Sequence, residues 1–142
     1  MAQSNPWQSY RQVATKTASP GQLILMLYEG AVRFLEQGRT GFGLEDPLES
    51  NQTVHNNLQK AISIINELNY SLNMEAGGEF AARMRGLYGY MERTLYEANR
   101  SKTQAGVDDV LKRLEVLRDA WKEMLQSKGA EMAPLTSLTA LG

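Results

Sequence analysis

The apolar residues of this chain recur at the three- and four-residue spacing of amphipathic α-helices. Segments rich in glycine, proline or asparagine separate four such stretches, and no alternating strand pattern competes with them. We expect helices over residues 20–37, 47–72, 79–100 and 104–126. Four amphipathic helices joined by short connections predict an all-α fold, an antiparallel up-down four-helix bundle with an N-terminal arm. The expected organisation is an arm over residues 1–18, the bundle over 19–126 and a flexible C-terminal tail over 127–142.

The start of the first helix is specified by its own residues. Ser19 suits the N-cap, Pro20 the first helical position and Gln22 the reciprocal position of a capping box. Gly38, followed by Gly41 and Gly43, predicts where this helix ends and the next connection begins.

The first helix carries more apolar surface than one core-facing side needs. At about 100° per residue, Leu27 and Ala31 mark the core-facing side, together with Leu23 and Phe34. Leu25 and Val32 fall roughly opposite, with Tyr28 between the two sides. A helix that is apolar around most of its circumference must be covered on two sides. We expect that the second cover is either the rest of this chain or another polypeptide.

The third helix has an unusual outer side. Its core-facing stripe begins at Phe80, whereas Ala82, Gly86 and Gly89 line up on the reverse side with Tyr90 and Tyr96 beside them. Each mid-helix glycine costs about 1 kcal/mol relative to alanine. Two interpretations stay open: another backbone comes close to this side, or the glycines are tolerated on a solvated surface.

Apolar residues also occur in the two terminal segments. In the arm, Trp7, Tyr10 and Val13 are spaced by three, and this spacing predicts that the arm lies on a surface. That surface is either its own bundle or a groove that the arm occupies until a partner arrives. The tail contains Leu135, Leu138 and Leu141 but is too short for a core of its own.

Charge and composition exclude several classes of function. A net charge of −1 without a basic block argues against nucleic-acid binding. The chain has no cysteine, and His55 is its one histidine, so cysteine chemistry and a di-metal bundle site are excluded. No phosphate-binding glycine loop or nucleophile motif occurs, and no apolar run is long enough to insert into a membrane. We therefore expect a cytoplasmic protein that is not an enzyme and needs no cofactor.

Several short motifs, in this order and spacing, resemble the family of flagellin-specific export chaperones, FliS. They are Asn5-Pro6-Trp7-Gln8-Ser9-Tyr10, Thr17-Ala18-Ser19-Pro20, Leu25-Met26-Leu27-Tyr28-Glu29-Gly30-Ala31, Gly77-Gly78-Glu79, Leu87-Tyr88-Gly89-Tyr90-Met91 and Leu117-Arg118-Asp119-Ala120-Trp121. The resemblance covers about residues 5–125. It implies a cytosolic helical bundle that binds the disordered C-terminal segment of flagellin, prevents premature polymerisation and delivers flagellin to a component of the flagellar export gate. It also implies that the arm covers part of the client groove, and that some members meet a cytosolic flagellin regulator or an anti-sigma factor.

Together, the residue pattern and the resemblance predict two client-contacting surfaces, with Tyr10 locking the arm over part of the client groove. The predicted client-binding residues are Tyr10, Leu25, Tyr28, Val32, Ala82, Gly86, Gly89, Tyr90 and Tyr96. A different hypothesis is a structural protein without a client, in which the surplus apolar side of the first helix closes a homodimer.

Overall fold

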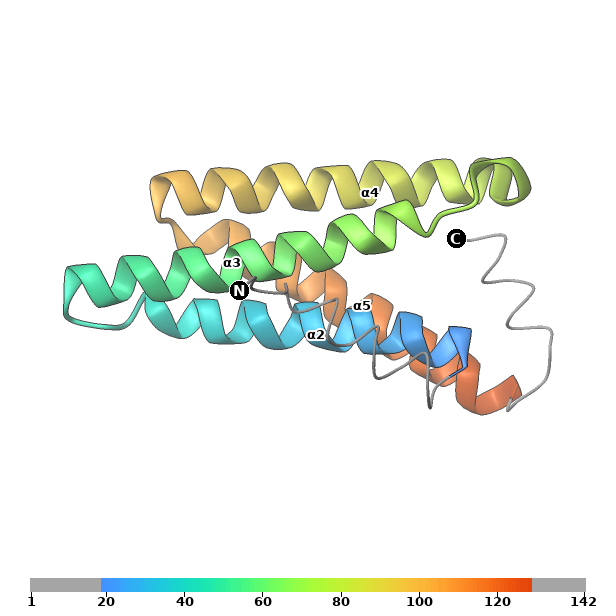
Figure 1. The fold of residues 1–142 in the computed structure, drawn as a ribbon, viewed down its shortest axis with the longest axis horizontal. Helices are drawn as coiled ribbons and strands as arrows, with labels where there is room; N and C mark the ends of the chain where they lie inside the picture. The colour runs from blue at the N-terminus through green and yellow to red at the C-terminus, as the bar shows by residue number, and fades with distance from the viewer. Residues whose placement is uncertain (1–18, 129–142) are drawn as a thin grey trace, which may run out of the picture.

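The fold is an antiparallel bundle of four helices, as the sequence predicts (Figure 1). The structure is a computed structural model and describes residues 19–128. In it, α2 spans Pro20–Gly41, α3 Pro47–Tyr70, α4 Met74–Ser101 and α5 Gln104–Lys128. The last helix thus extends two residues beyond the expected bundle boundary at residue 126, while residues 1–18 and 129–142 lie outside the described part of the chain.

The four helices form a ring in which each has two neighbours. Helix α2 packs against α3 and α5, and α4 packs against the same two helices. Helices α2 and α4 are therefore diagonal partners across the core. The beginnings of α2 and α4 and the ends of α3 and α5 gather at one end of the molecule, on the right in Figure 1.

Local capping interactions fix the starts of three helices. The N–H of Gln22 donates to the Ser19 hydroxyl at 3.2 Å, and the Gln22 side chain accepts from the Ser19 N–H at 3.2 Å. This confirms the predicted capping box. Asp46 accepts from the N–H of Glu49 at 2.8 Å before α3, and the Asn73 side chain caps α4 in the same way. Such caps satisfy N–H groups that have no acceptor within the helix.

The predicted end of the first helix at Gly38 is wrong, because α2 continues to Gly41. The two glycines are buried where α2 meets α3. A Cβ atom at Gly38 would lie 2.8 Å from Cδ1 of Leu58, and one at Gly41 would lie 2.9 Å from Cγ2 of Val54. These positions therefore allow close packing of the two helices instead of terminating α2.

Helix α4 begins five residues earlier than the sequence suggests. Met74 to Gly77 form one helical turn, and the chain then bends at Gly78, which has φ 54° and ψ −130°. This conformation is open to glycine and strained for other residues. The predicted break is therefore a kink at Gly78.

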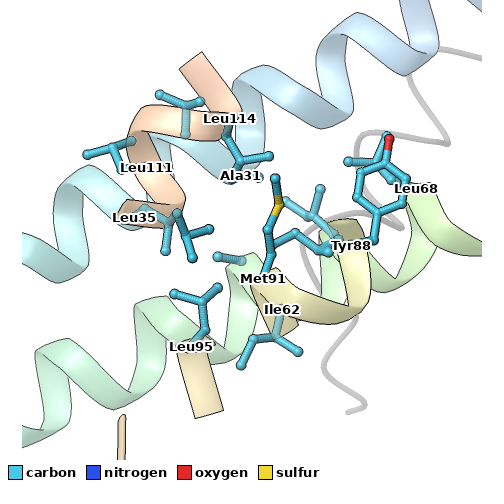
Figure 2. Close-up of a cluster of buried hydrophobic side chains, with 14 of the residues drawn as sticks. Ala31, Leu35, Ile62, Leu68, Tyr88, Met91, Leu95, Leu111 and Leu114 are labelled. Atoms are coloured by element: carbon cyan, nitrogen blue, oxygen red, sulfur yellow. The ribbon is translucent and has the colours of Figure 1, made fainter. Parts of the chain in front are cut away.

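Apolar side chains from all four helices fill the centre of the bundle. Figure 2 shows Ala31 and Leu35 of α2 meeting side chains of the other three helices, and Leu35 is completely buried. Helix α3 turns a continuous apolar stripe towards this centre. The buried residues of α3 are Val54, Leu58, Ala61, Ile62, Ile64, Ile65 and Leu68. The helix ends at Tyr70, two residues before the expected end, and Leu72 is buried just after it.

Val32, which the sequence places opposite the core-facing side of the first helix, and Tyr28, which it places between the two sides, are both buried, so the expected free surface is wrong at these two positions. Each side chain is only 3% exposed, and Leu25 is half-buried against the core. The buried arc of α2 is wide because α3 covers one flank of the helix and α5 the other. Helices α3 and α5 of this chain thus cover most of the surplus apolar side of α2. The homodimer hypothesis, which needs this surface to be free, loses its structural basis.

Candidate functional site

An apolar cavity opens at the end of the bundle where α2 begins and α5 ends. Its volume is about 320 Å³, about twice the ~150 Å³ of an apolar cavity that takes up benzene. All four helices contribute to its wall. The lining residues are Ile24, Tyr28, Leu68, Ser71, Leu72, Phe80, Met84, Tyr88, Leu117, Ala120, Trp121 and Met124. This composition suits large apolar side chains of a ligand.

Two of the residues that line this cavity, Tyr28 and Tyr88, are joined through their hydroxyl groups. Tyr28 of α2 and Tyr88 of α4 come from diagonal helices, and their hydroxyl oxygens lie 2.6 Å apart. Each residue is only 3% exposed. Burial raises the pKa of both phenols, so both side chains are neutral at physiological pH. The pair ties α2 to α4 across the core.

The indole of Trp121 fixes the wall contributed by α5. Its Nε1–H donates to the carbonyl oxygen of Gly21 at 3.0 Å, which joins the last part of α5 to the first turn of α2. The ring centroids of Trp121 and Tyr28 are 6.4 Å apart with an interplanar angle of 59°. This tilted arrangement is a favourable one for aromatic pairs. The cavity therefore has a rigid wall on this side.

The tyrosine pair should be detectable as an energetic coupling. We expect Tyr28→Phe and Tyr88→Phe each to lower the free energy of unfolding by about 1 kcal/mol, because the remaining buried hydroxyl loses its partner. The double variant should be close to either single variant, since no orphaned hydroxyl remains. Urea unfolding of the four proteins gives the coupling energy. Strictly additive losses would contradict the hydrogen bond.

The rim of the cavity is more exposed than the sequence suggests. Phe80, expected in the core, is 45% exposed, because it lies in the first turns after the Gly78 kink. Met84 and Met124 are half-buried beside it, and Ala120 is exposed. A ligand that covers the mouth would therefore bury additional apolar surface. Sequence analysis missed Ala120, Trp121 and Met124, although all are apolar residues near the end of a helix in an antiparallel bundle.

The small residues predicted on the third helix lie on the outer side of α4. Gly86 and Ala82 are exposed, and a Cβ atom at Gly86 would meet nothing within 4 Å. The guanidinium of Arg93 lies 3.2 Å from a Cβ position at Gly89. Within residues 19–128, no other backbone covers this side. It faces away from the side of α4 that lines the cavity, so the two surfaces are separate.

The two tyrosines beside the small residues differ in their contacts. The hydroxyl of Tyr90 donates to Oδ2 of Asp109 on α5 at 2.6 Å, and the guanidinium of Arg113 lies 4.9 Å from the centre of its ring. The hydrogen bond from Tyr90, with help from Arg113, holds the pKa of Asp109 below its usual range. Tyr96 is 55% exposed. Tyr90 is thus held against α5, whereas Tyr96 is open to solvent.

Replacing Gly86 with alanine tests whether its side of α4 is open. We expect Gly86→Ala to raise the free energy of unfolding by about 1 kcal/mol, because alanine favours the helix and its methyl group meets no atom. Thermal or urea unfolding measures the change. A loss of stability would show that this surface is covered.

The predicted binding residues therefore fall into four groups. Tyr28 lines the cavity, and Val32 and Leu25 pack in or against the core. The other predicted binding residues within 19–128 lie on the outer side of α4, and they are Ala82, Gly86, Gly89, Tyr90 and Tyr96. Tyr10 lies outside the described residues, so both interpretations of the arm stay predictions.

The described residues contain no candidate metal site. Across positions 19–128, no three side chains of His, Cys, Asp or Glu come together as a metal site. His55 instead contacts Asn99, with Nδ1 and Nδ2 2.9 Å apart. In the same part of the chain, none of the helices combines the length and apolarity needed to cross a membrane.

Comparison with known proteins identifies the family. The family model described as "Flagellar protein FliS" matches residues 3–128. The flagellar secretion chaperone FliS of Bacillus subtilis is 38% identical over 90% of this chain and 92% of that protein. The chaperones of the same name from Salmonella typhimurium and Escherichia coli are 36% identical (82% of this chain, 87% of that protein) and 34% identical (90% and 95%). Because the match spans the arm and all four helices, the chain belongs to the FliS family of flagellar proteins.

Proposed function

We propose that this protein is a cytosolic flagellar secretion chaperone that binds the C-terminal segment of flagellin. Its relatives carry the name of flagellar secretion chaperones, and the motifs that resemble them run from the arm to the end of the bundle. By binding that segment, the protein keeps flagellin from polymerising before export. It then delivers flagellin to a component of the flagellar export gate, and its further partners are a cytosolic flagellin regulator or an anti-sigma factor.

The observation that carries this proposal is the open apolar cavity at the bundle end. Large side chains such as leucine or phenylalanine of the client enter it and replace water against an almost entirely apolar wall. Client residues on either side of the inserted side chain pack against the exposed part of Phe80. Side-chain insertion into a preformed cavity needs no nucleotide and is reversible.

The outer side of α4 is proposed as a second contact. Gly86 and Ala82 leave its backbone accessible, so that a client helix can approach closely, and Tyr96 offers an exposed aromatic ring beside them. Since the cavity and this side face different directions, one client segment reaches both by passing around α4. A client that is disordered before binding can wrap in this way.

Calorimetry and circular dichroism with the isolated C-terminal segment of flagellin test the proposal. We expect saturable binding with a negative heat-capacity change, because apolar surface is buried, and a gain in helicity as the segment folds. Sedimentation of the mixture should show one segment per chaperone. Absence of binding, together with an unchanged spectrum, would contradict the proposal.

A further inference from the structure

A polar hollow lies between α3 and α4, outside the end cavity. Its volume is about 240 Å³, and its lining residues are Asn66, Asn69, Tyr70 and Arg85. The first three belong to the end of α3, and Arg85 belongs to the neighbouring helix α4 (Figure 1). None of the four lines the apolar end cavity, so the hollow is a separate site.

The hollow adjoins the end cavity along the edge where α3 meets α4. On α4, Met84 lines the cavity and the next residue, Arg85, lines the hollow. On α3, Leu68 lines the cavity and the next residue, Asn69, lines the hollow. Consecutive residues of a helix point about 100° apart, so the two sites open on neighbouring faces. A peptide that leaves the cavity over this edge can therefore place its following residues in the hollow.

Arg85 gives the hollow a positive charge that none of residues 19–128 neutralises. Its guanidinium forms no ion pair with them, and its one hydrogen bond runs from Nη2 to the carbonyl oxygen of Asn69 at 3.5 Å. This is long, because charge-assisted N–H···O bonds measure about 2.7–2.9 Å. The same carbonyl oxygen also accepts from the N–H of Leu72 at 3.2 Å, so it has a partner without Arg85. The guanidinium thus keeps most of its donors for a ligand.

The other polar groups of the hollow are also unused. The side chains of Asn66, Asn69 and Tyr70 form no hydrogen bond within the described part of the chain, and Oδ1 of Asn69 is buried there without a donor. A buried acceptor without a partner is unfavourable, and no bond holds this carboxamide in its present orientation. The hollow contains a cation, amide donors and amide acceptors but no carboxylate. This chemistry suits a peptide carboxylate with a backbone N–H beside it.

We propose that the polar hollow binds a carboxylate of the client segment, an inference that rests on the proposed function. The guanidinium of Arg85 donates to the carboxylate oxygens, and the carboxamides of Asn66 and Asn69 bind the neighbouring polar atoms of the peptide. The carboxylate belongs either to the end of the flagellin segment or to one of its Asp or Glu side chains. With an apolar side chain in the cavity and a carboxylate in the hollow, the client crosses the bundle over the edge between α3 and α4.

Titration with a small carboxylate tests the site without flagellin. N-acetyl-leucine, which carries a carboxylate and an amide N–H, is added to the ¹⁵N-labelled full chain, and N-acetyl-leucinamide is the uncharged control. We expect the Nε–Hε signal of Arg85, assigned by its loss in Arg85→Gln, to shift saturably with the acid and not with the amide. Arg83, which pairs with Glu79 at 3.6 Å, is the internal control. Equal shifts at Arg83 and Arg85 would show non-specific screening and overturn the proposal.

Calorimetry with the flagellin C-terminal segment tests whether the client uses the hollow. We expect Arg85→Gln to weaken binding on the order of fivefold, the effect of one partly exposed ion pair. Arg83→Gln is the matched control and should leave the affinity unchanged. Thermal unfolding should give the same Tm for Arg85→Gln and the unaltered chain, since the substitution removes only the 3.5 Å contact with Asn69. A lower Tm with unchanged binding would show that Arg85 only supports the end of α3, and would overturn the proposal.

Two altered forms of the segment identify the source of the carboxylate. If it is the chain end, amidation of the segment removes the effect of Arg85→Gln. If it is a side chain, the effect persists after amidation and disappears when the Asp and Glu residues of the segment are replaced by Asn and Gln. Either result supports the proposal, whereas an equal effect of Arg85→Gln on every form would overturn it.

Failure of the proposed function gives a different result. If the segment does not bind the unaltered chain at all, the chaperone function is contradicted, while the titration with N-acetyl-leucine still decides whether the hollow takes a carboxylate. If the segment binds and Arg85→Gln leaves its affinity unchanged, the function stands and the assignment of the client's carboxylate to the hollow is overturned.

Discussion

Replacing Ala120 with tryptophan should lower the affinity for the flagellin C-terminal segment at least about tenfold, or about 1.4 kcal/mol. Ala120 is exposed on the rim of the cavity, so an indole at this position can turn into the cavity without displacing a core residue. It would then occupy the space that the client's apolar side chains need. Calorimetric titration of the variant measures the loss.

Ala105→Trp is the matched control for this experiment. Ala105 is an exposed alanine on the same helix, near its beginning and away from the cavity. It adds the same side chain and should leave the affinity unchanged. Circular dichroism and urea unfolding of both variants should show an intact bundle. Equal binding by Ala120→Trp and Ala105→Trp would contradict the assignment of the client site to the cavity.

The second large effect is expected at the contact between α2 and α3. Gly41→Ala should lower the free energy of unfolding by about 2 to 3 kcal/mol, because inserting a methyl group into a well-packed contact forces the backbone or its neighbours to move. The new Cβ would lie 2.9 Å from Cγ2 of Val54 and 3.0 Å from its backbone nitrogen. A backbone atom cannot rotate out of the way. Urea unfolding measures the change.

Two neighbouring glycines provide a graded comparison. At Gly38 the nearest atom is the end of the Leu58 side chain, at 2.8 Å, which can change rotamer, so Gly38→Ala should cost less than Gly41→Ala. A Cβ at Gly43 would meet only the carbonyl oxygen of Thr40, at an ordinary 3.7 Å, so Gly43→Ala should be nearly neutral. An equal loss for all three variants would show that close helix packing is not the cause.

The sequence alone predicted the helices and their starts because those depend on neighbouring residues. Ser19 and Gln22 form the capping box within one turn, and the apolar stripe of the second helix has a single period over its whole length. Asp46 with Pro47 starts α3 for the same local reason. Such features need no knowledge of the rest of the fold.

Features that depend on neighbouring helices were beyond the sequence pattern. In the sequence, Gly38 and Gly41 look like residues that end a helix. Only the close approach of α3 in the structure shows that they allow the two helices to pack. The surplus apolar side of α2 was assigned to a foreign chain because the pattern does not show that two helices flank α2. Tyr28 is buried because these two helices cover it. It also lines the end cavity, which the sequence pattern did not locate.

The most direct test of the central claim uses methionine methyl groups as reporters of the cavity. Met84 and Met124 line it, Met91 is fully buried in the core, and Met26 is half-buried on α2 outside the cavity lining. The protein is labelled with methyl-¹³C methionine and titrated with the flagellin C-terminal segment. We predict that the Met84 and Met124 signals shift most and that Met26 stays in place. Saturable binding that leaves both Met84 and Met124 unshifted would show that the client does not enter the end cavity.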